Sequence, residues 1–304
     1  MIIDTHSHLG DVLFGKNITF RQNVVSREHS DLLTRLEEND NVPYPEFLAM
    51  PQDILMEIML NVEQARNGTA SLQNMQASMN ANGVDRIWVL PILPRVGFEE
   101  VLAASKLEPR IVPFTGIDFA LGEAAADKAL ADAKKGAGGL KVHPILQQRP
   151  MDDEIIVSVL EAWEETGKPV IFHTYSYHYY HPEESYMNKP EYGDNTGFVK
   201  LAERFPKLTM IAAHAGGPFD FDQILEGKDL PNLYVDVSFQ PGEVIEKFIK
   251  AFGPERVMLG SDWPWGCMET PIRLLKQIAG DNASLADMLF FKNALRLQGE
   301  NSEI

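Results

Sequence analysis

Histidines and an aspartate that could together bind a metal ion occur at separate points along the chain. His6 and His8 stand two residues apart in the opening segment IIDTHSH, and His173, His214 and Asp262 follow much later. Residues two apart on a strand point to the same face, so the first two imidazoles would lie side by side. Imidazoles with a carboxylate suit Zn²⁺ or a similar divalent ion. If the fold brings these residues together, the sequence predicts a metal site with a position left for water, which is typical of catalysis.

The segments that carry these side chains are short, apolar and rich in β-branched residues, as expected of strands buried on both faces of a parallel sheet. There are eight of them: Ile2–His8, Arg86–Leu93, Ile111–Asp118, Gly139–His143, Pro169–Tyr175, Leu208–His214, Leu233–Phe239 and Arg256–Asp262. Longer segments between them have helical patterns: Leu121–Lys135, Asp152–Thr166, Glu243–Phe252, Thr270–Ala279 and Asp281–Leu297. This alternation predicts an α/β fold, a (β/α)8 TIM barrel, in which residues at the carboxyl ends of the strands meet at one rim. An open, doubly wound sheet is disfavoured because the chain lacks a glycine-rich phosphate-binding loop.

One stretch between the first two strands is too long for an ordinary loop. Gly10–Gly83 contains helical patterns near Glu28–Glu38, Asp53–Arg66 and Ser71–Asn82. We therefore expect residues 10–83 to form a helical insertion on the barrel, within a single domain that spans residues 1–304.

A second long stretch, Tyr175–Gly197, follows the fifth predicted strand. It holds six of the eight tyrosines: Tyr175, Tyr177, Tyr179, Tyr180, Tyr186 and Tyr192. Because it follows the strand with His173, we expect it to lie over the metal site, where Tyr175 would contact the substrate. Tyrosine is also enriched at subunit interfaces, so a homodimer is the alternative interpretation.

The composition limits the partners and the compartment. The chain has 27 basic and 44 acidic residues, so its net charge is −17. This negative charge would repel phosphate backbones and anionic lipids. We therefore expect a small-molecule substrate and neither nucleic acid nor membrane as a partner. The chain has no apolar run of about 20 residues and no signal-peptide pattern. Its one cysteine, Cys267, can form neither an intrachain disulfide nor a thiolate zinc site, and we expect a cytoplasmic protein.

The short sequence motifs around the candidate ligands resemble those of the amidohydrolase superfamily. They are IDTHSHL, GLKVHP, HAGG at His214–Gly217, GSDWP at Gly260–Pro264 and KNALRL at Lys292–Leu297. Over nearly the whole chain they are similar to the amidohydrolase-2 branch. That branch includes metal-dependent hydrolases, sugar and pyrone lactonases, and enzymes like aminocarboxymuconate-semialdehyde decarboxylase.

The resemblance implies roles for the residues singled out above. His6, His8, His173 and Asp262 would hold one metal ion, expected to be Zn²⁺, with Mn²⁺ as an alternative. Asp262 would also move a proton, and His214 would act as an acid/base or polarise the substrate. A bound Zn²⁺ lowers the pKa of its water to about 7, which makes hydroxide available to attack a carbonyl.

Other polar residues are candidates for substrate binding. Lys141 and His143 lie on the fourth predicted strand. Lys141 would form a hydrogen bond or balance charge in the pocket, with a carboxylated lysine that bridges two metals as the alternative. His143 would contact the substrate or orient another group. Arg149 could bind a substrate carboxylate or be an ordinary surface arginine, and Asp4 either orients a ligating histidine or caps the first strand.

These features favour a metal-dependent, lactonase-like hydrolase that opens an amide, ester or lactone of a small organic molecule. One alternative is a non-oxidative, metal-dependent decarboxylase of a small aromatic or unsaturated acid. Another is a non-catalytic metal-binding barrel or ligand sensor, which is disfavoured because every predicted metal ligand is present.

Overall fold

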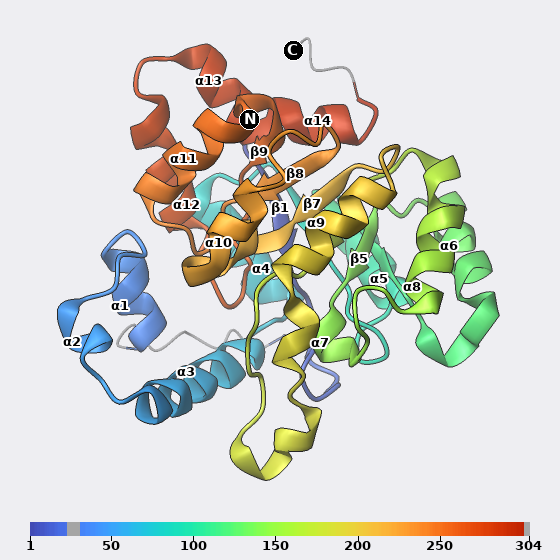
Figure 1. The fold of residues 1–304 in the computed structure, drawn as a ribbon, viewed down its shortest axis with the longest axis horizontal. Helices are drawn as coiled ribbons and strands as arrows, with labels where there is room; N and C mark the ends of the chain where they lie inside the picture. The colour runs from blue at the N-terminus through green and yellow to red at the C-terminus, as the bar shows by residue number, and fades with distance from the viewer. Residues whose placement is uncertain (23–30, 301–304) are drawn as a thin grey trace.

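Nine short parallel strands form the centre of the molecule (Figure 1). The computed structural model describes residues 1–22 and 31–300, apart from the side chains of residues 218 and 219. The strands are β1 (Ile3–Ser7), β2 (Arg86–Val89), β3 (Ile111–Pro113), β4 (Thr115–Gly116), β5 (Leu140–Val142), β6 (Val170–Phe172), β7 (Met210–Ala212), β8 (Leu233–Asp236) and β9 (Val257–Met258). They are ordered β1-β2-β3 in one sheet and β4-β5-β6-β7-β8-β9 in the other, and every pair is parallel.

The boundary between the two sheets falls inside the third predicted strand. This strand is divided at Phe114 into β3 and β4. Phe114 still donates its backbone N–H to Val89 O at 3.0 Å, so the chain stays beside β2. Its ring packs against the backbone of Gly139, where a Cβ atom would lie 2.1 Å from the ring. Only glycine fits there, which explains the glycine just before β5.

Hydrogen bonds also connect β1 with the segment that follows β9. Thr5 N–H donates to Leu259 O at 2.9 Å, and Asp262 N–H donates to His6 O at 2.8 Å. Ser7 and Trp263 form an isolated parallel bridge. The first and last strand segments are therefore neighbours, and the strands surround one continuous apolar core. This is the predicted α/β architecture of a (β/α)8 barrel.

Helices pack around the strands (Figure 1). They are α5 (Phe98–Leu107), α6 (Ala125–Lys134), α7 (Pro144–Gln147), α8 (Glu154–Trp163), α9 (Asn195–Arg204), α10 (Gly217–Leu225), α11 (Gly242–Phe252), α12 (Glu269–Ala279), α13 (Ala283–Asp287) and α14 (Asn293–Leu297). The helix α11 shows why they pack there, since Val244, Ile245, Phe248 and Phe252 recur at helical spacing and are buried. The last predicted helix is present, with a π-helical turn at Met288–Lys292 between α13 and α14.

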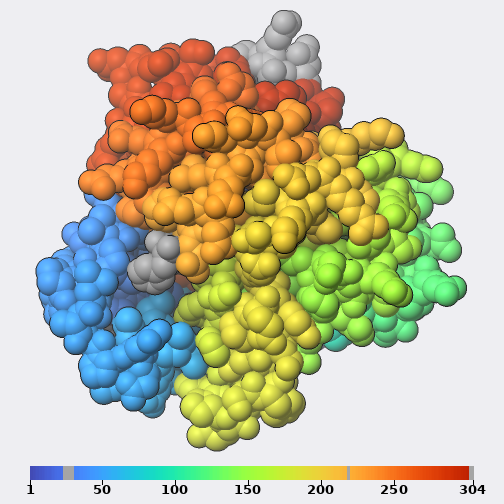
Figure 2. Space-filling model, viewed as in Figure 1, coloured from blue at the N-terminus to red at the C-terminus, as the bar shows by residue number. Residues whose placement is uncertain are grey.

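The described residues between β1 and β2 form four helices, in the stretch predicted to be an insertion. They are α1 (Leu32–Glu38), α2 (Pro45–Leu48), α3 (Gln52–Asn67) and α4 (Leu72–Asn82). The helix predicted over Glu28–Glu38 begins at Leu32, capped by Asp31, and its residues 28–30 lie outside the described part of the chain. In Figure 2 this segment, in blue, stands beside the yellow stretch that follows β6.

Arg66 of α3 fixes the first three of these helices to the barrel. Its guanidinium is buried and pairs with Asp31 at 2.8 Å and Glu37 at 3.0 Å, at the two ends of α1. It also donates to the backbone oxygen of Trp265, in the loop after β9. A buried arginine requires such partners, because an unpaired charge in the interior would cost several kcal/mol. The α1–α3 segment is therefore tied to the loop that carries Asp262.

The tyrosine-rich stretch is ordered by its own polar contacts. It contains short helical turns at Pro182–Met187 and Pro190–Gly193, and α9 begins at Asn195, inside the predicted loop. Tyr179 and Tyr180 are buried, whereas Tyr186 is exposed. The backbone oxygen of Tyr179 accepts a hydrogen bond from Gln64 of α3, so this stretch contacts the insertion.

Among the described residues, no helix is both long enough and apolar enough to cross a bilayer.

Candidate metal centre

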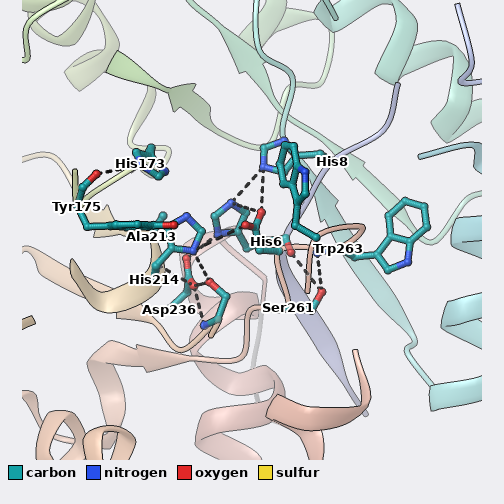
Figure 3. A network of polar contacts seen from close by, with 12 residues as sticks. His6, His8, His173, Tyr175, Ala213, His214, Asp236, Ser261 and Trp263 are labelled. Atoms are coloured by element: carbon teal, nitrogen blue, oxygen red, sulfur yellow. Dashed lines mark hydrogen bonds and ion pairs between the residues drawn. The ribbon is translucent and has the colours of Figure 1, made fainter. Parts of the chain in front are cut away.

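The predicted metal-binding residues lie at the carboxyl ends of the strands, where a small cavity opens between them (Figure 3). β1 carries His6, with His8 just beyond it, while His173 follows β6, His214 follows β7 and Asp262 follows β9. The cavity has about 320 Å³ of open space, its mouth included. Its walls are His6, His8, Glu63, Lys141, His143, His173, Tyr175, Tyr179, His214, Phe239, Asp262 and Trp265.

Three side-chain atoms form a nearly equilateral triangle at the base of this cavity. Nε2 of His6, Nε2 of His8 and Oδ1 of Asp262 each lie 3.3 Å from the other two. Two donors on a tetrahedral Zn²⁺, each about 2.0 Å from the ion, lie about 3.3 Å apart. Asp262 Oδ1 is buried and has no hydrogen-bond partner among the described residues, which is costly unless a cation binds it. The three residues therefore fit a divalent metal.

The hydrogen bonds of His6 and His8 are made through Nδ1, which leaves their Nε2 atoms able to bind a metal. His6 Nδ1 lies 2.9 Å from Asp236 Oδ2, and His8 Nδ1 lies 2.7 Å from the backbone oxygen of Leu90. Both partners are acceptors, so each Nδ1 carries the proton and each Nε2 keeps a lone pair. Burial lowers the pKa of both histidines well below the ordinary value, and nearby positive charge lowers it further. Both imidazoles are therefore neutral and able to bind a metal.

Asp236, which the sequence analysis missed, organises two sides of the site. This fully buried residue ends β8 and accepts hydrogen bonds from His6 Nδ1, His214 N–H and Ser238. The sequence feature that could have identified Asp236 is its place in the apolar segment LYVDVSF, because a charged residue within an apolar strand is rarely buried without a partner. Asp236 orients one predicted ligand and holds the backbone of the predicted acid/base.

We expect the isosteric change Asp236→Asn to weaken metal binding about 10–100-fold, the usual effect of losing such an orienting carboxylate. The amide would no longer stabilise the His6 tautomer that presents Nε2. Competition with a chromophoric chelator for Zn²⁺ measures the affinity, and Asp229→Asn at an exposed position is the control. Equal affinities in the two variants would contradict this role.

His214 is positioned as a proton-transferring group. Its Nδ1 lies 2.8 Å from Ser238 Oγ, whose own hydroxyl donates to Asp236. Ser238 Oγ must therefore accept a hydrogen bond from the Nδ1–H group of His214, which leaves the lone pair on Nε2. The same Nδ1 is 3.9 Å from Asp262 Oδ2, and burial lowers the pKa of His214 well below its ordinary value. The neutral ring can accept a proton in this cavity.

The backbone around the cavity is strained. His214, Asp262, Tyr175 and Phe239 all line it, and they have φ values of +61°, +57°, +77° and +60°. A residue with a Cβ rarely adopts this left-handed conformation, which costs about 1–3 kcal/mol and is concentrated at functional sites. The fold therefore holds these four side chains in place at a cost in stability.

His173 lines the cavity but lies apart from the three-atom triangle. Its Nε2 is 3.2 Å from the backbone oxygen of Tyr175 and 3.4 Å from Tyr179 Oη. Donation to the carbonyl oxygen leaves the lone pair on Nδ1, so the ring keeps one nitrogen able to bind a metal. Its ring is stacked on His143 at 4.1 Å. Metal ligation by His173 stays a prediction.

The residues predicted to bind substrate lie in different surroundings. Lys141 and Tyr175 line the cavity, and Lys141 Nζ is 3.4 Å from His6 Nε2. Burial lowers the pKa of Lys141 to about 8, against the opposing effect of the aspartates. His143 also lines the cavity and caps α7, since its Nδ1 accepts from Leu146 N–H. Arg149 is not brought to the cavity.

Arg149 and Asp4 are engaged elsewhere. Arg149 is partly exposed, pairs with Asp153 at 3.4 Å and lies over the ring of Phe119. Asp4 is buried and accepts hydrogen bonds from the backbone N–H groups of His6 and Ser261. It therefore fixes the loop before Asp262 against β1, rather than contacting an imidazole. Burial raises the pKa of Asp4 to about 7.

Two further cavity residues, Glu63 and Trp265, were not predicted. Glu63 of α3 accepts a 2.7 Å hydrogen bond from Tyr177 Oη. The Trp265 indole donates to the backbone oxygen of Glu63 and packs edge-on against His8. The helical pattern predicts α3, but it does not indicate that the carboxyl group of Glu63 points toward the barrel.

Burial raises the pKa of Glu63 to about 8, despite its hydrogen bond from Tyr177 and the charge of Arg66. Between about pH 5 and 8 the folded chain would keep this proton while the unfolded chain releases it. The free energy of unfolding should therefore fall as the pH rises through this range. We expect a shallower fall in Glu63→Gln, measured by urea unfolding of metal-loaded protein at several pH values. The exposed change Glu57→Gln should leave the slope unaltered, and parallel profiles for all three proteins would contradict the prediction.

The fold and the cavity together define the class of the protein. It is a (β/α)8-barrel protein with histidines and an aspartate gathered at the carboxyl ends of its strands. A model of the amidohydrolase family matches residues 3–299, and the chain therefore belongs to this family, whose members are enzymes.

Solved structures of similar fold cover nearly the whole chain. A 5-carboxyvanillate decarboxylase from Sphingomonas paucimobilis is 16% identical, with 99% of each chain covered and a TM-score of 0.64. A probable 2-pyrone-4,6-dicarboxylic acid hydrolase from Acinetobacter baumannii is 14% identical, with 98% of this chain and 99% of that one covered and a TM-score of 0.61. A zinc-bound amidohydrolase from Burkholderia multivorans is 15% identical, with 99% and 100% covered and a TM-score of 0.64. These similarities establish the TIM-barrel fold. A search of curated protein sequences finds no significant match.

Proposed function

We propose that the protein is a metal-dependent hydrolase that cleaves an amide, ester or lactone of a small organic molecule. The observation that carries this proposal is the triangle of His6, His8 and Asp262 atoms at 3.3 Å, with an unpaired carboxylate oxygen at one corner. A divalent ion bound there, Zn²⁺ or Mn²⁺, supplies Lewis acidity and lowers the pKa of a bound water to about 7. Zinc in the structure of the Burkholderia amidohydrolase supports the choice of ion.

The side chains around this triangle supply the proton transfers. Asp262 offers one oxygen to the metal and has its second oxygen 3.9 Å from His214. His214 is held by Ser238 with its free nitrogen unprotonated, so it can take a proton and return it to a leaving group. A positioned acid or base of this kind is typically worth about 10²–10⁴ in rate.

The charges in the cavity favour a neutral carbonyl substrate over a carboxylic acid. Lys141 is the one Lys or Arg side chain among the described residues that line it, and it lies against His6. Asp262 and Glu63 contribute carboxyl groups to the same walls. A substrate carboxylate would thus have the metal and Lys141 as its positively charged partners among the described residues, and for this reason hydrolysis is proposed rather than decarboxylation.

A substrate panel tests this assignment. Protein loaded with Zn²⁺ or Mn²⁺ is incubated with lactones, aryl esters and amides, and separately with hydroxybenzoates, while acid release and carbon dioxide are followed. We expect acid release from at least one carbonyl class and its loss in Asp262→Asn. Carbon dioxide evolution without ester, lactone or amide cleavage would replace the proposal with a decarboxylase. Protein that binds neither metal and shows neither reaction would favour a non-catalytic sensor.

A further inference from the structure

A second, much larger cavity lies between the α1–α3 segment and the barrel. It has about 1710 Å³ of open space, its mouth included, and we name it the insertion chamber. Its apolar walls come from α1, α2, α3 and the loops between them: Leu32, Leu33, Leu36, Pro43, Phe47, Leu48, Met50, Leu55, Met56 and Met59. Methionine-rich walls adapt to apolar ligands of different shapes. The site described above makes no use of this space.

The insertion chamber adjoins the metal-site cavity. Glu63, Tyr175 and Phe239 line both. Tyr175 and Phe239 belong to the strained backbone positions at the barrel rim, and Glu63 is fixed by Tyr177. A molecule whose reactive group lies at the metal site would therefore have its remaining part directed past these three residues into the chamber.

The charge of the chamber restricts what that remaining part can be. Its described carboxyl groups are those of Glu37, Glu63 and Asp220, and no lysine or arginine among the described residues lines it. Glu37 is already paired with Arg66. An anionic group would be desolvated here with no positively charged partner on the described walls, which is unfavourable. An uncharged apolar group would instead gain burial against leucine and methionine.

On the basis of the proposed function, we propose that the insertion chamber binds an uncharged, apolar acyl or alkyl portion of the substrate. The metal site would act on a carbonyl group at one end of such a molecule. Substrates with a second carboxylate at the far end would be excluded. Each added methylene that enters the chamber should raise kcat/KM about fourfold, the equivalent of about 0.8 kcal/mol, until the space is filled.

Binding of a neutral fluorescent ligand, N-phenyl-1-naphthylamine, tests the chamber without requiring turnover. We expect binding to the wild-type protein and at least a tenfold weaker affinity in Met59→Trp, which places an indole in the chamber. Ile54→Trp on the same helix is the matched control, because Ile54 is 46% exposed and does not line the chamber. Leu36→Trp, from α1, serves as a second filling variant if Met59→Trp fails to fold, as judged by circular dichroism. Equal affinity in the filled and control variants would overturn the proposal.

A series of 4-nitrophenyl esters then separates this inference from the proposed function. The acyl groups are acetyl, butyryl, hexanoyl and a hexanoyl group that ends in a carboxylate. We expect kcat/KM to rise from acetyl to hexanoyl, to drop at least tenfold with the terminal carboxylate, and to lose its length dependence in Met59→Trp. Hydrolysis of all four at one rate would overturn the chamber and leave the hydrolase standing. A further outcome is that the dye binds more weakly to Met59→Trp than to Ile54→Trp while no ester, lactone or amide is cleaved. That result would support the chamber and overturn the hydrolase.

Discussion

Removal of bound metal by a chelator is expected to reduce hydrolysis to background, and Zn²⁺ or Mn²⁺ should restore it. The physical reason is the geometry of His6, His8 and Asp262, whose facing nitrogen and oxygen atoms lie at the spacing of ligands on one cation. Metal content by mass spectrometry should fall from one ion per chain in step with activity.

The same removal should lower thermal stability. A ligand present at 100 times its Kd stabilises the folded state by about 2.7 kcal/mol, so the metal-free protein should melt at a lower temperature. Dialysis against the chelator already saturated with Zn²⁺ is the control for direct chelator effects. Full activity in protein shown to be free of metal would rule out the proposed chemistry.

Replacing Asp262 with asparagine is expected to lower kcat/KM by a factor of about 10³ or more. The change removes a charged metal ligand. It also removes the carboxylate that accepts a proton, and each of these two roles contributes a large part of the rate. It conserves shape, so the backbone at φ +57° should tolerate it, since asparagine also adopts this conformation. Steady-state kinetics with metal analysis on the same samples separates weaker binding from slower turnover.

Asp153→Asn is the matched control for this variant. Asp153 caps α8 and pairs with Arg149, away from the cavity, and asparagine can keep the cap. The control should retain wild-type kcat/KM and metal content. An Asp262→Asn protein with more than a tenth of wild-type activity would show that the reaction does not depend on this carboxylate.

The barrel and the ends of its strands could be predicted from the sequence for a definite physical reason. In a parallel barrel the carboxyl ends of all strands face one rim, so recognising the apolar segments also places the residues that follow them. His6, His8, His214 and Asp262 therefore meet although up to 256 positions separate them. The division of the third strand at Phe114 was not predicted, because the contacts at this point, such as the Phe114 ring against Gly139, join neighbouring strands and leave no pattern within one segment.

Residues outside the strand ends could not be placed in the same way. Glu63 reaches the cavity because Arg66, one turn further along α3, is fixed to Trp265 and to α1. Helical periodicity identifies α3 but does not determine how it docks. Arg149, predicted as a substrate-binding candidate, lies beyond α7 and pairs with Asp153, four positions along the chain. A local ion pair of this kind competes with any role at a distant site.

Asp236 has a consequence for how the two halves of the site communicate. Through its first oxygen it holds the Ser238 hydroxyl that fixes the His214 ring, and through its second it anchors His6. Protonation of His214 and binding of a cation beside His6 are therefore both stabilised by the negative charge of Asp236. By thermodynamic linkage, each event alters the other's equilibrium by the same factor, so a change in the identity of the ion should change the acidity of the His214 imidazole.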